Sequence, residues 1–383
     1  MQPRLRIYLD CNSTSPMLPE VWEAMKPFAS EDYGNPASSH AAGRKARQAL
    51  EDAREEIASL LGAFADEVFF TSGATEGNNQ AILGAAGKGN ILASPIEHPS
   101  IMEPLKVLEK QGREVEWLKV DPQGLALLPE ELPAEVALCV LMLVNHETGM
   151  MQPVEEMGKL AEGKAWFHCD AAQAAGKIKI DFHRLRPHSL TLSAHKFNGP
   201  KGAGVLLIRR GSSCPALLHG GHQQHGLRPG TESPGLAVGG ALALRKAMEQ
   251  LSWRRDKVAA LRKIFVEAIL QAIPGVWING EENPLLPHTI NLGFPGLRGD
   301  ILLMRLDLEG VCCSTGSACS SGSLLPSPVL LAMGQSPERA RSAMRFSLGH
   351  LLGEEEAREG AARVVETARQ LYKNSGEIES FRK

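Results

Sequence analysis

Apolar segments of strand length alternate with segments of helical periodicity between residues 67 and 210 of the chain. The apolar runs are EVFFTSG, ILASPIEH, EVEWLKV, VALCVLMLVNHE, AWFHCDAAQ, SLTLSAHK and GVLLIRR, and helical patterns such as PSIMEPLKVLEKQG and VEEMGKLAEG lie between several of them. Strands that alternate with helices form mostly parallel sheets with helices on both faces. The sequence therefore predicts an α/β fold with a mostly parallel, seven-stranded, doubly wound sheet.

Two further patterns indicate the domain organisation. Residues 38–62 space alanine, isoleucine and leucine at helical intervals and end at a glycine, which predicts an amphipathic helix. From about residue 236 a long helical pattern leads into short strand-like segments, HTINLGF and MRFSLG, mixed with helices. We expect a large domain at residues 14–250 and a smaller α+β domain built from residues 1–13 and 251–383.

Charge and hydropathy exclude several classes of partner. The formal net charge is -3 over 383 residues, and no block of like charge is present, so neither nucleic acid nor a membrane surface is an expected partner. The N-terminus lacks the apolar segment of a signal peptide, and no stretch approaches the roughly twenty apolar residues of a membrane span. We expect a cytoplasmic protein that acts on small, neutral or zwitterionic substrates.

The seven cysteines are scattered and odd in number, which argues against a secreted disulfide framework. Cys139 lies in an apolar run and is expected to fill space in the core. Cys312 and Cys313 are adjacent, so on a strand they would point to opposite faces and pack. Cys319, in the Ser/Gly-rich stretch GVCCSTGSACSSGSLLP, lies where a thiol could reach a substrate, and is the candidate nucleophile.

Small residues follow a buried strand in FFTSGATEGNN, where a helix is expected to start at Glu76. Backbone N–H groups at such a strand-to-helix turn can surround a phosphate at the positive end of the helix. An ordinary helix cap explains this motif alone equally well. Because neither GxGxxG nor the glycine-lysine pair of a P-loop is present, a phosphate on a cofactor other than a dinucleotide is favoured.

Four more polar residues follow or interrupt apolar runs. Asp170 could hold a pyridinium nitrogen protonated, and Gln173 could reach a ring oxygen, although an aspartate at such a position is more often a helix cap. Lys196 follows a strand, where desolvation suits a Schiff-base lysine, against the usual alternative of a surface lysine. Arg345 could bind a carboxylate bidentately through its planar guanidinium group. A structural ion pair is an alternative of equal weight.

A metal site is not expected. His219, His222 and His225 recur at a spacing of three, but the surrounding glycines argue against a helix that would align them on one face.

Ten motifs together resemble the cysteine desulfurases of the NifS/IscS type, in the class V aminotransferase branch of the fold-type I pyridoxal-phosphate (PLP) enzymes. They occur in the family's order across nearly the whole chain: YLDCNSTSP, YGNPASSHAAGRKAR, FTSGATEGNN, EHPS, VNHETG, HCDAAQAAGK, SAHKFNGPKG, RPGTES, STGSACSSGS and MRFSLGH. The resemblance implies a PLP-dependent, aminotransferase-like fold and a homodimer with the cofactor near the subunit boundary.

The resemblance also assigns roles to individual residues. It implies that Lys196 is the Schiff-base lysine, that Asp170 pairs with the pyridinium nitrogen and that Gln173 contacts the phenolic oxygen of PLP. The implied phosphate site consists of Ala74, Thr75, Ser193 and His195, with Thr231 reaching in from the partner subunit. The remaining implied roles are His98 stacking on the cofactor and assisting proton transfer, Asn145 and Arg345 holding the substrate carboxylate, with Asn145 also beside the cofactor, and Cys319 acting as nucleophile.

The implied reaction converts L-cysteine to L-alanine and leaves the sulfur on Cys319 as a persulfide. A loop at about residues 312–325 in the small domain is expected to carry Cys319 to a sulfur acceptor, such as an iron–sulfur scaffold or a sulfur carrier, for iron–sulfur cluster, thio-cofactor or tRNA synthesis. One departure from the family is Pro229, in RPGTES, where a serine is usual. Pro229 bears on the phosphate contact across the dimer.

Other functions remain open from the sequence alone. A selenocysteine lyase, a cysteine or cystine C–S lyase and an aminotransferase of the same branch would all keep Lys196 and Asp170. Cys319 favours desulfuration, because elimination and transamination need no thiol nucleophile. A non-catalytic sulfur-trafficking scaffold is disfavoured, because the whole set of candidate residues is retained.

Overall fold

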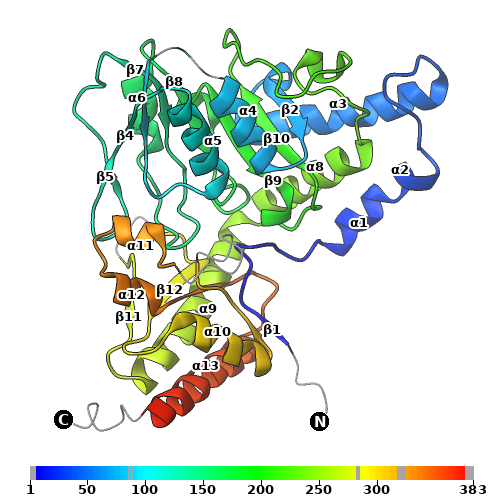
Figure 1. Ribbon diagram of the computed structural model, residues 1–383. Coiled ribbons are helices and arrows are strands. Elements are labelled where there is room, and N and C mark those ends of the chain that lie inside the picture. Colours follow the sequence, from blue (N-terminus) through cyan, green and yellow to red (C-terminus); the bar gives the residue numbers. More distant parts are fainter. Residues whose placement is uncertain (1–5, 85–86, 88, 282–284, 317–324, 376–383) are drawn as a thin grey trace.

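A seven-stranded sheet lies in the upper part of the molecule as Figure 1 draws it. The computed structural model describes residues 6–84, 87, 89–281, 285–316 and 325–375. In spatial order the strands are β2 (Val68–Thr71), β10 (Gly204–Ile208), β9 (Ser189–Ser193), β8 (Trp166–Asp170), β7 (Val136–Val140), β3 (Asn90–Ala93) and β4 (Val115–Trp117). Neighbours are parallel except where β10 pairs with β2 and β9. The predicted α/β class and mostly parallel sheet are confirmed.

Helices cover both faces of this sheet. On one face α3 (Ala41–Leu61), α6 (Val154–Ala161) and α8 (Pro234–Glu249) share a hydrophobic cluster with the strands, and on the other lie α4 (Ala74–Gly84) and α5 (Pro99–Lys110). The alternation of side chains along β7 shows why two faces need covering: Cys139 packs into the first cluster, and Leu138 and Val140 pack into the second. The shorter elements here are α1 (Pro19–Met25), α2 (Pro27–Ser30), α7 (Phe182–Leu185), β5 (Lys119–Val120) and β6 (Ala126–Leu127).

The amphipathic helix expected at residues 38–62 is α3. Its first turn is capped by His40, whose Nδ1 accepts from the Gly43 N–H at 3.3 Å. Gly62 ends it in the left-handed conformation, with φ of 62°, which glycine adopts without steric cost.

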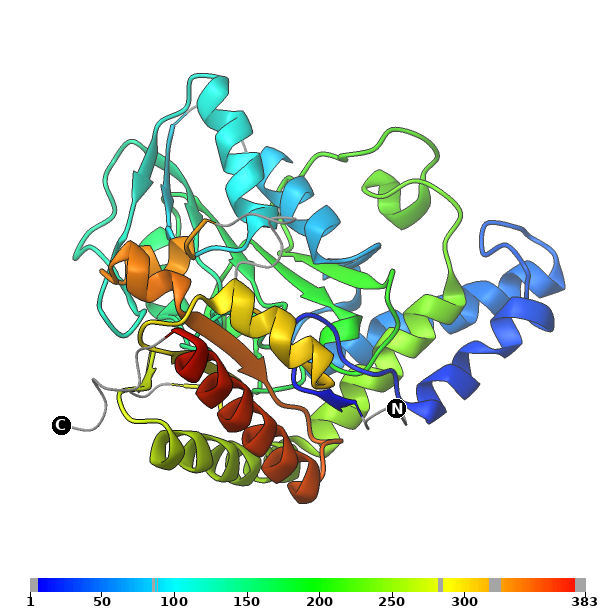
Figure 2. The same cartoon turned by 60° about the horizontal axis from the view of Figure 1, so that its bottom comes forward.

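A second group of elements forms the lower part of the molecule (Figure 1). Its sheet is antiparallel in the order β11 (Trp277–Ile278), β12 (Thr289–Gly293), β14 (Ala343–Ser347), and β1 (Ile7–Tyr8) pairs in parallel with β13 (Val311–Cys312). The helices are α9 (Leu251–Ala272), α10 (Gly299–Leu308), α11 (Pro328–Ala332), α12 (Pro337–Arg341) and α13 (Glu354–Ser375). Figure 2 shows α9 and α13 side by side.

The N-terminal segment packs with this second group. Ile7 and Leu9 are fully buried in a cluster whose other members come from α9, α10, α13 and the antiparallel sheet. The assignment of residues 1–13 to the smaller domain stays a prediction. The boundary at residues 250/251 itself stays a prediction.

The long helical pattern after residue 236 forms two helices rather than one. Gln250 separates α8 from α9 with φ of -104° and ψ of 13°, outside helical values. Its side-chain oxygen accepts from Arg254 Nε at 3.0 Å, which ties the break to the first turn of α9.

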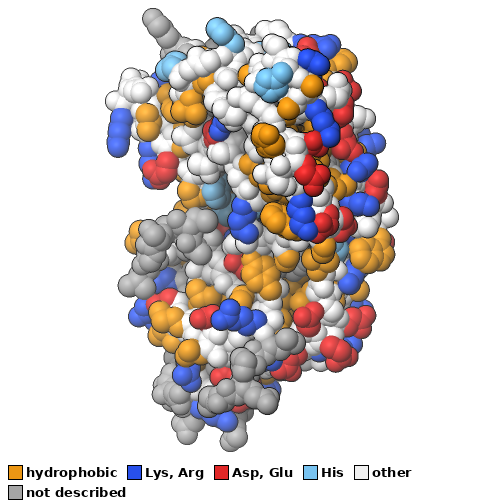
Figure 3. Space-filling model, turned by 90° about the vertical axis from the view of Figure 1, so that its right-hand side faces the viewer, with side chains coloured by type: hydrophobic (Ala, Val, Ile, Leu, Met, Phe, Trp, Pro, Cys, Tyr) orange, Lys and Arg blue, Asp and Glu red, His pale blue; other side chains and the backbone are white. Residues whose placement is uncertain are grey.

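The surface has no dominant charge on the face drawn in Figure 3, where acidic and basic side chains lie intermixed over much of the area. Within the described residues, no helix has the length and apolar character needed to cross a membrane.

Candidate active site

A cavity of about 480 Å³ opens where β2, β8 and β9 end. Eight of the residues singled out in the sequence line it: Ala74, Thr75, His98, Asp170, Gln173, Ser193, His195 and Lys196. Asn145, Thr231 and Arg345 are not among its lining residues. Cys319 lies outside the described residues. The strand ends of an open α/β sheet are where ligands bind, so the cavity has the position that the fold predicts.

One end of the cavity is formed by the start of α4. The helix begins at Ala74, two residues before the expected start at Glu76, because Gly73 turns the chain directly into it. A Cβ on Gly204 of β10 would lie 2.4 Å from Gly73 Cα, so glycine at residue 204 is what lets this turn approach the sheet. The exposed N–H groups of an 11-residue helix therefore face the cavity beside Thr75.

Asp170 ends β8 and lies at the base of the cavity, 6% exposed. Its Oδ1 accepts from the Ala172 N–H and its Oδ2 from Asn78 Nδ2, both at 2.8 Å. Among the described residues, no basic side chain lies within ion-pair distance of this carboxylate. A buried carboxylate without a counter-charge is costly, so the base of the cavity is suited to a cationic N–H group.

Lys196 follows β9 in a short 3-10 turn at the opposite wall. Its Nζ donates to the carbonyl oxygens of Asn12 at 2.5 Å and Ser13 at 3.0 Å. Behind it, Lys177 Nζ donates to Asn12 Oδ1 at 3.2 Å and to Gln173 Oε1 at 2.8 Å. Burial, with Lys196 nearby, lowers the pKa of Lys177 to about 7. Two amines thus share one small polar network.

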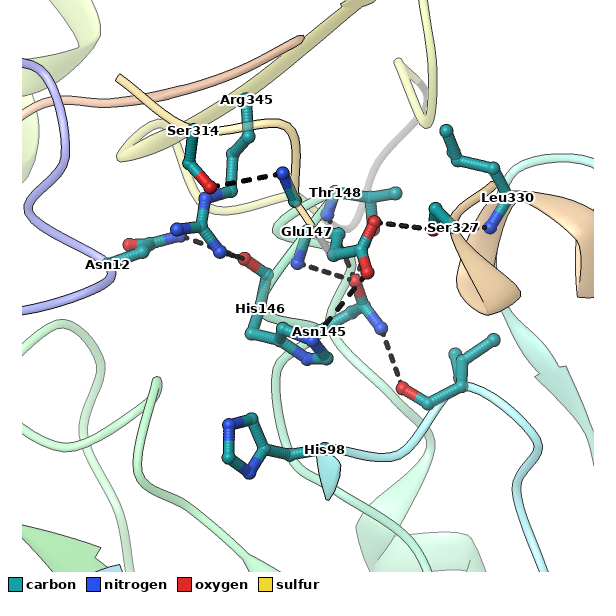
Figure 4. A network of polar contacts seen from close by, with 12 residues as sticks. Asn12, His98, Asn145, His146, Glu147, Thr148, Ser314, Ser327, Leu330 and Arg345 are labelled. Carbon is teal, nitrogen blue, oxygen red and sulfur yellow. Dashed lines mark hydrogen bonds and ion pairs between the residues drawn. The ribbon is translucent and has the colours of Figure 1, made fainter. Parts of the chain in front are cut away.

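Two neighbouring histidines, His98 and His146, line the cavity. The rings of His98 and His146 are 5.3 Å apart and nearly perpendicular, as Figure 4 shows. Burial lowers the pKa of His98 and lowers that of His146 further, so both rings are neutral at neutral pH. His98 Nδ1 lies 2.8 Å from Ser100 Oγ, which holds its ring in place. A neutral, oriented imidazole is suited to accepting a proton.

Arg345 lies at the edge of this network, 4% exposed. Its guanidinium donates to Asp10 Oδ1 at 3.0 Å, to Ser13 Oγ at 2.9 Å and to the His146 carbonyl at 3.2 Å. Arg345 therefore forms the structural ion pair that was one alternative from the sequence, and it also bonds to Ser13 and His146, which line the cavity. Its binding of a carboxylate stays a prediction.

Asn145 is fully buried and its amide is occupied. Nδ2 donates to the Ile96 carbonyl at 3.1 Å, and Oδ1 accepts from the N–H groups of Glu147 and Thr148 (Figure 4). These bonds shape the turn that carries His146. The structure thus places Asn145 under the cavity wall and not at its surface.

Thr231 lines a neighbouring cavity of about 210 Å³ together with Ser72 and Arg228. Arg228 forms an ion pair with Glu76 at 2.9 Å, which ties this loop to the first turn of α4. The loop that carries Pro229 therefore lies beside the candidate phosphate end, separated from the main cavity by residues 72–76.

The sequence analysis missed four residues that shape the site: Asn12, Asn78, His146 and Lys177. Asn78, three residues after the predicted phosphate ligand Thr75 on α4, joins Asp170 to His168, whose Nε2 lies 3.0 Å from Asn78 Oδ1. All four lie within motifs that carry the family resemblance, YLDCNSTSP, FTSGATEGNN, VNHETG and HCDAAQAAGK, and their place in these motifs was the available signal.

The model of the aminotransferase class-V family matches residues 7–359. The chain belongs to the class-V aminotransferase family. It is 42% identical to the cysteine desulfurase IscS of Dictyoglomus turgidum over 353 residues, 90% of this chain and 89% of the relative. It is 40% identical to the cysteine desulfurase IscS of Clostridium botulinum strain Hall over 355 residues, again 90% and 89%.

Solved structures agree with this family membership. A NifS-like protein superposes with a TM-score of 0.88 at 35% identity, covering 94% of this chain and 99% of the other. The NifS-like protein of Rickettsia africae has a TM-score of 0.84 at 29% identity, covering 96% and 99%. Among class-V aminotransferases, the chain is thus similar to the cysteine desulfurases along nearly its whole length, as the sequence motifs predicted.

Proposed function

We propose that this protein is a PLP-dependent cysteine desulfurase that converts L-cysteine to L-alanine and takes up the sulfur on Cys319 as a persulfide. In the overall transfer the carbon–sulfur bond of cysteine breaks, a sulfur–sulfur bond forms on Cys319, and the departing carbon gains a proton. The observation that carries the proposal is one cavity lined by both Lys196 and the carboxylate of Asp170, which forms no ion pair with any described residue.

The residues of the cavity fit PLP. The N-terminus of α4, with Ala74 and Thr75, together with Ser193 and His195, would hold the phosphate. At the other end Asp170 would supply the counter-charge to the pyridinium nitrogen, and Gln173 would donate toward the phenolic oxygen. When bound through Lys196, PLP withdraws electrons from the Cα of an amino acid.

Proton movement would fall to Lys196 and His98. The amine of Lys196 donates to two backbone carbonyls, an arrangement that holds this half-buried side chain at the cavity wall. His98, neutral and held by Ser100, would take or return a proton on the opposite side of the substrate.

Arg345 would bind the substrate carboxylate. Its guanidinium Nε has no hydrogen-bond partner among the described residues, and its Asp10 and Ser13 contacts hold the fork in a fixed direction. Asn145 would support this contact by shaping the turn on which His146 accepts from Arg345.

The cysteines of the described part support Cys319 as the nucleophile. Burial raises the thiol pKa at every one of them, to about 11 for Cys11 and Cys214 and to about 12 for Cys139. The same cause raises it at Cys169, Cys312 and Cys313. Since the thiolate is the reactive form, these six are poor nucleophiles at neutral pH.

The proposal also includes the oligomeric state, the compartment, the sulfur acceptor and the domain boundaries of the protein. The protein would act as a homodimer in the cytoplasm, with Thr231 reaching the phosphate of the partner subunit's cofactor. The loop at about residues 312–325 would pass sulfur to an iron–sulfur scaffold or a sulfur carrier. Residues 14–250 would form the large domain, and residues 1–13 with 251–383 the small one.

A substitution of Cys319 tests the reaction. With L-cysteine as substrate, the wild-type holoenzyme should form alanine, and Cys319→Ser should lose alanine formation while keeping the cofactor absorbance. Cys139→Ser serves as the matched control and should retain turnover. Alanine or pyruvate formed by Cys319→Ser at the wild-type rate would assign the protein to the lyases instead.

A further inference from the structure

A second cavity, of about 160 Å³, lies behind Lys196, which lines both cavities. It is bounded by the chain after β1, by the start of α9 and by residues 348–352, where the two groups of elements meet (Figure 2). It reaches the surface at Arg6 and at Leu351, which is 52% exposed. Its volume is well above the roughly 10–15 Å³ that a single water needs.

The inner wall of this second cavity carries buried positive charge. Arg254 is 4% exposed, and Glu20 is the one carboxylate that acts on it through space; among the described residues no carboxylate lies within ion-pair distance of it. Its Nε donates to Gln250 and its Nη1 to Asn198 Oδ1 at 3.3 Å, while Nη2 has no partner in the described part of the chain. Burial of a guanidinium whose N–H groups lack hydrogen-bond acceptors costs free energy unless an anion binds to it.

His288 adds a second unpartnered atom to the same cavity. It is 8% exposed, and its Nδ1 makes no hydrogen bond with any described residue. Arg254 and Lys177 line the same cavity as His288. Burial keeps the ring neutral, so it can donate one N–H without adding charge.

Most of the charged residues that line this cavity are basic. Arg6, Lys177 and Lys196 line it, and Glu356 is the one acidic residue among its described lining. Glu356 Oε2 already accepts from the Gly353 N–H at 2.8 Å. His350 is also present, and burial lowers its pKa to about 4, so it carries no charge near neutral pH.

We propose that this cavity is a binding site for a small oxyanion, a carboxylate or an ion of sulfate or phosphate size, held by Arg254 and His288 with Lys177 at the inner wall. Guanidinium groups prefer the oxygens of such ions, and a cavity of about 160 Å³ has room for one of them. The proposal does not depend on the proposed function.

Calorimetric titration of the holoenzyme with sodium sulfate and, separately, sodium acetate at constant ionic strength tests it. The loaded cofactor keeps the phosphate end of the main cavity filled. We expect wild-type protein to bind one ion per chain, and Arg254→Met to bind it at least about tenfold more weakly. Arg255→Met, the next arginine on α9, is exposed and should bind as wild type does.

Further variants separate the outcomes. Arg254→Lys keeps the positive charge but lacks the planar guanidinium, and His288→Phe leaves Arg254 in place. Both variants should weaken binding, and they test the proposal even if Arg254→Met fails to fold. Acetate can also enter the substrate site at Arg345, but such binding would persist in Arg254→Met. Binding that is equal in wild type and Arg254→Met, or no binding to wild type, would overturn the proposal.

Discussion

At the residue scale, the site depends on polar side chains that lack their counter-charge. Asp170 is held by Asn78 and the Ala172 N–H but has no basic partner among the described residues. Its negative charge is therefore available to the cofactor, and neutralising it should impair the chemistry more than the fold.

We expect Asp170→Asn to keep the fold and to lower turnover by about 10- to 150-fold, because a charge-assisted hydrogen bond contributes about 1.5–3 kcal/mol. Steady-state alanine formation measures this change, and the cofactor absorbance reports occupancy. Asp256→Asn, at an exposed position on α9, is the matched control. Turnover equal to wild type in Asp170→Asn would remove Asp170 from the proposed site.

At the scale of elements, Glu147 joins the turn under the cavity to the start of α11. Its Oε2 accepts from Ser327 Oγ at 2.6 Å, and the same Oγ caps α11 by accepting from the Leu330 N–H at 3.1 Å (Figure 4). Gly316 packs against this carboxylate, since a Cβ there would lie 2.6 Å from Oε2. Both described edges of the segment that contains Cys319 therefore rest on one buried side chain.

Burial raises the pKa of Glu147 to about 7 from its ordinary value of 4.5. Between these values the folded state holds a proton that the unfolded state has lost, so stability falls as pH rises from about 4.5 to about 7. In Glu147→Gln this dependence should vanish. Urea unfolding of both proteins across that range should show their difference changing by up to about 1.4 kcal/mol per pH unit. A difference that stays constant with pH would mean that the pKa of Glu147 is not raised in the folded state.

The sequence predicted elements better than it predicted contacts between them. Strand ends are local features, so the apolar runs before Asp170 and Lys196 located both residues at the cavity. Asn78 reaches Asp170 only because α4 packs across β8 and β9. Asn145 lies under the cavity wall because its amide bonds to the Ile96 carbonyl. Such tertiary hydrogen bonds leave no periodicity in the sequence.

At the scale of the whole molecule, the two groups of elements share the site. The upper group provides Asp170 and Lys196, and the lower group provides Arg345 of β14, which bonds to Ser13 and His146 at the cavity wall. The N-terminal segment crosses between them, where Asn12 contacts Gln173 and Thr289. The candidate site therefore requires both groups to be packed together.

The proposed homodimer is also a property of the whole molecule. We expect light scattering of the holoenzyme to give twice the mass of one chain, because Thr231 lies outside the main cavity of its own subunit and is proposed to serve the partner's. Thr231→Ala should then weaken PLP binding without changing that mass. A monomeric, fully active protein would exclude a role for Thr231 across subunits.

The central claim is that sulfur from cysteine comes to rest on Cys319. Peptide mass spectrometry of the holoenzyme after a single addition of L-cysteine, without a reducing agent, tests it most directly. The account predicts that the peptide containing Cys319 gains the mass of one sulfur atom and that alanine appears in equal amount. Alanine formed with no added sulfur on Cys319, or added sulfur on another cysteine instead, would contradict it.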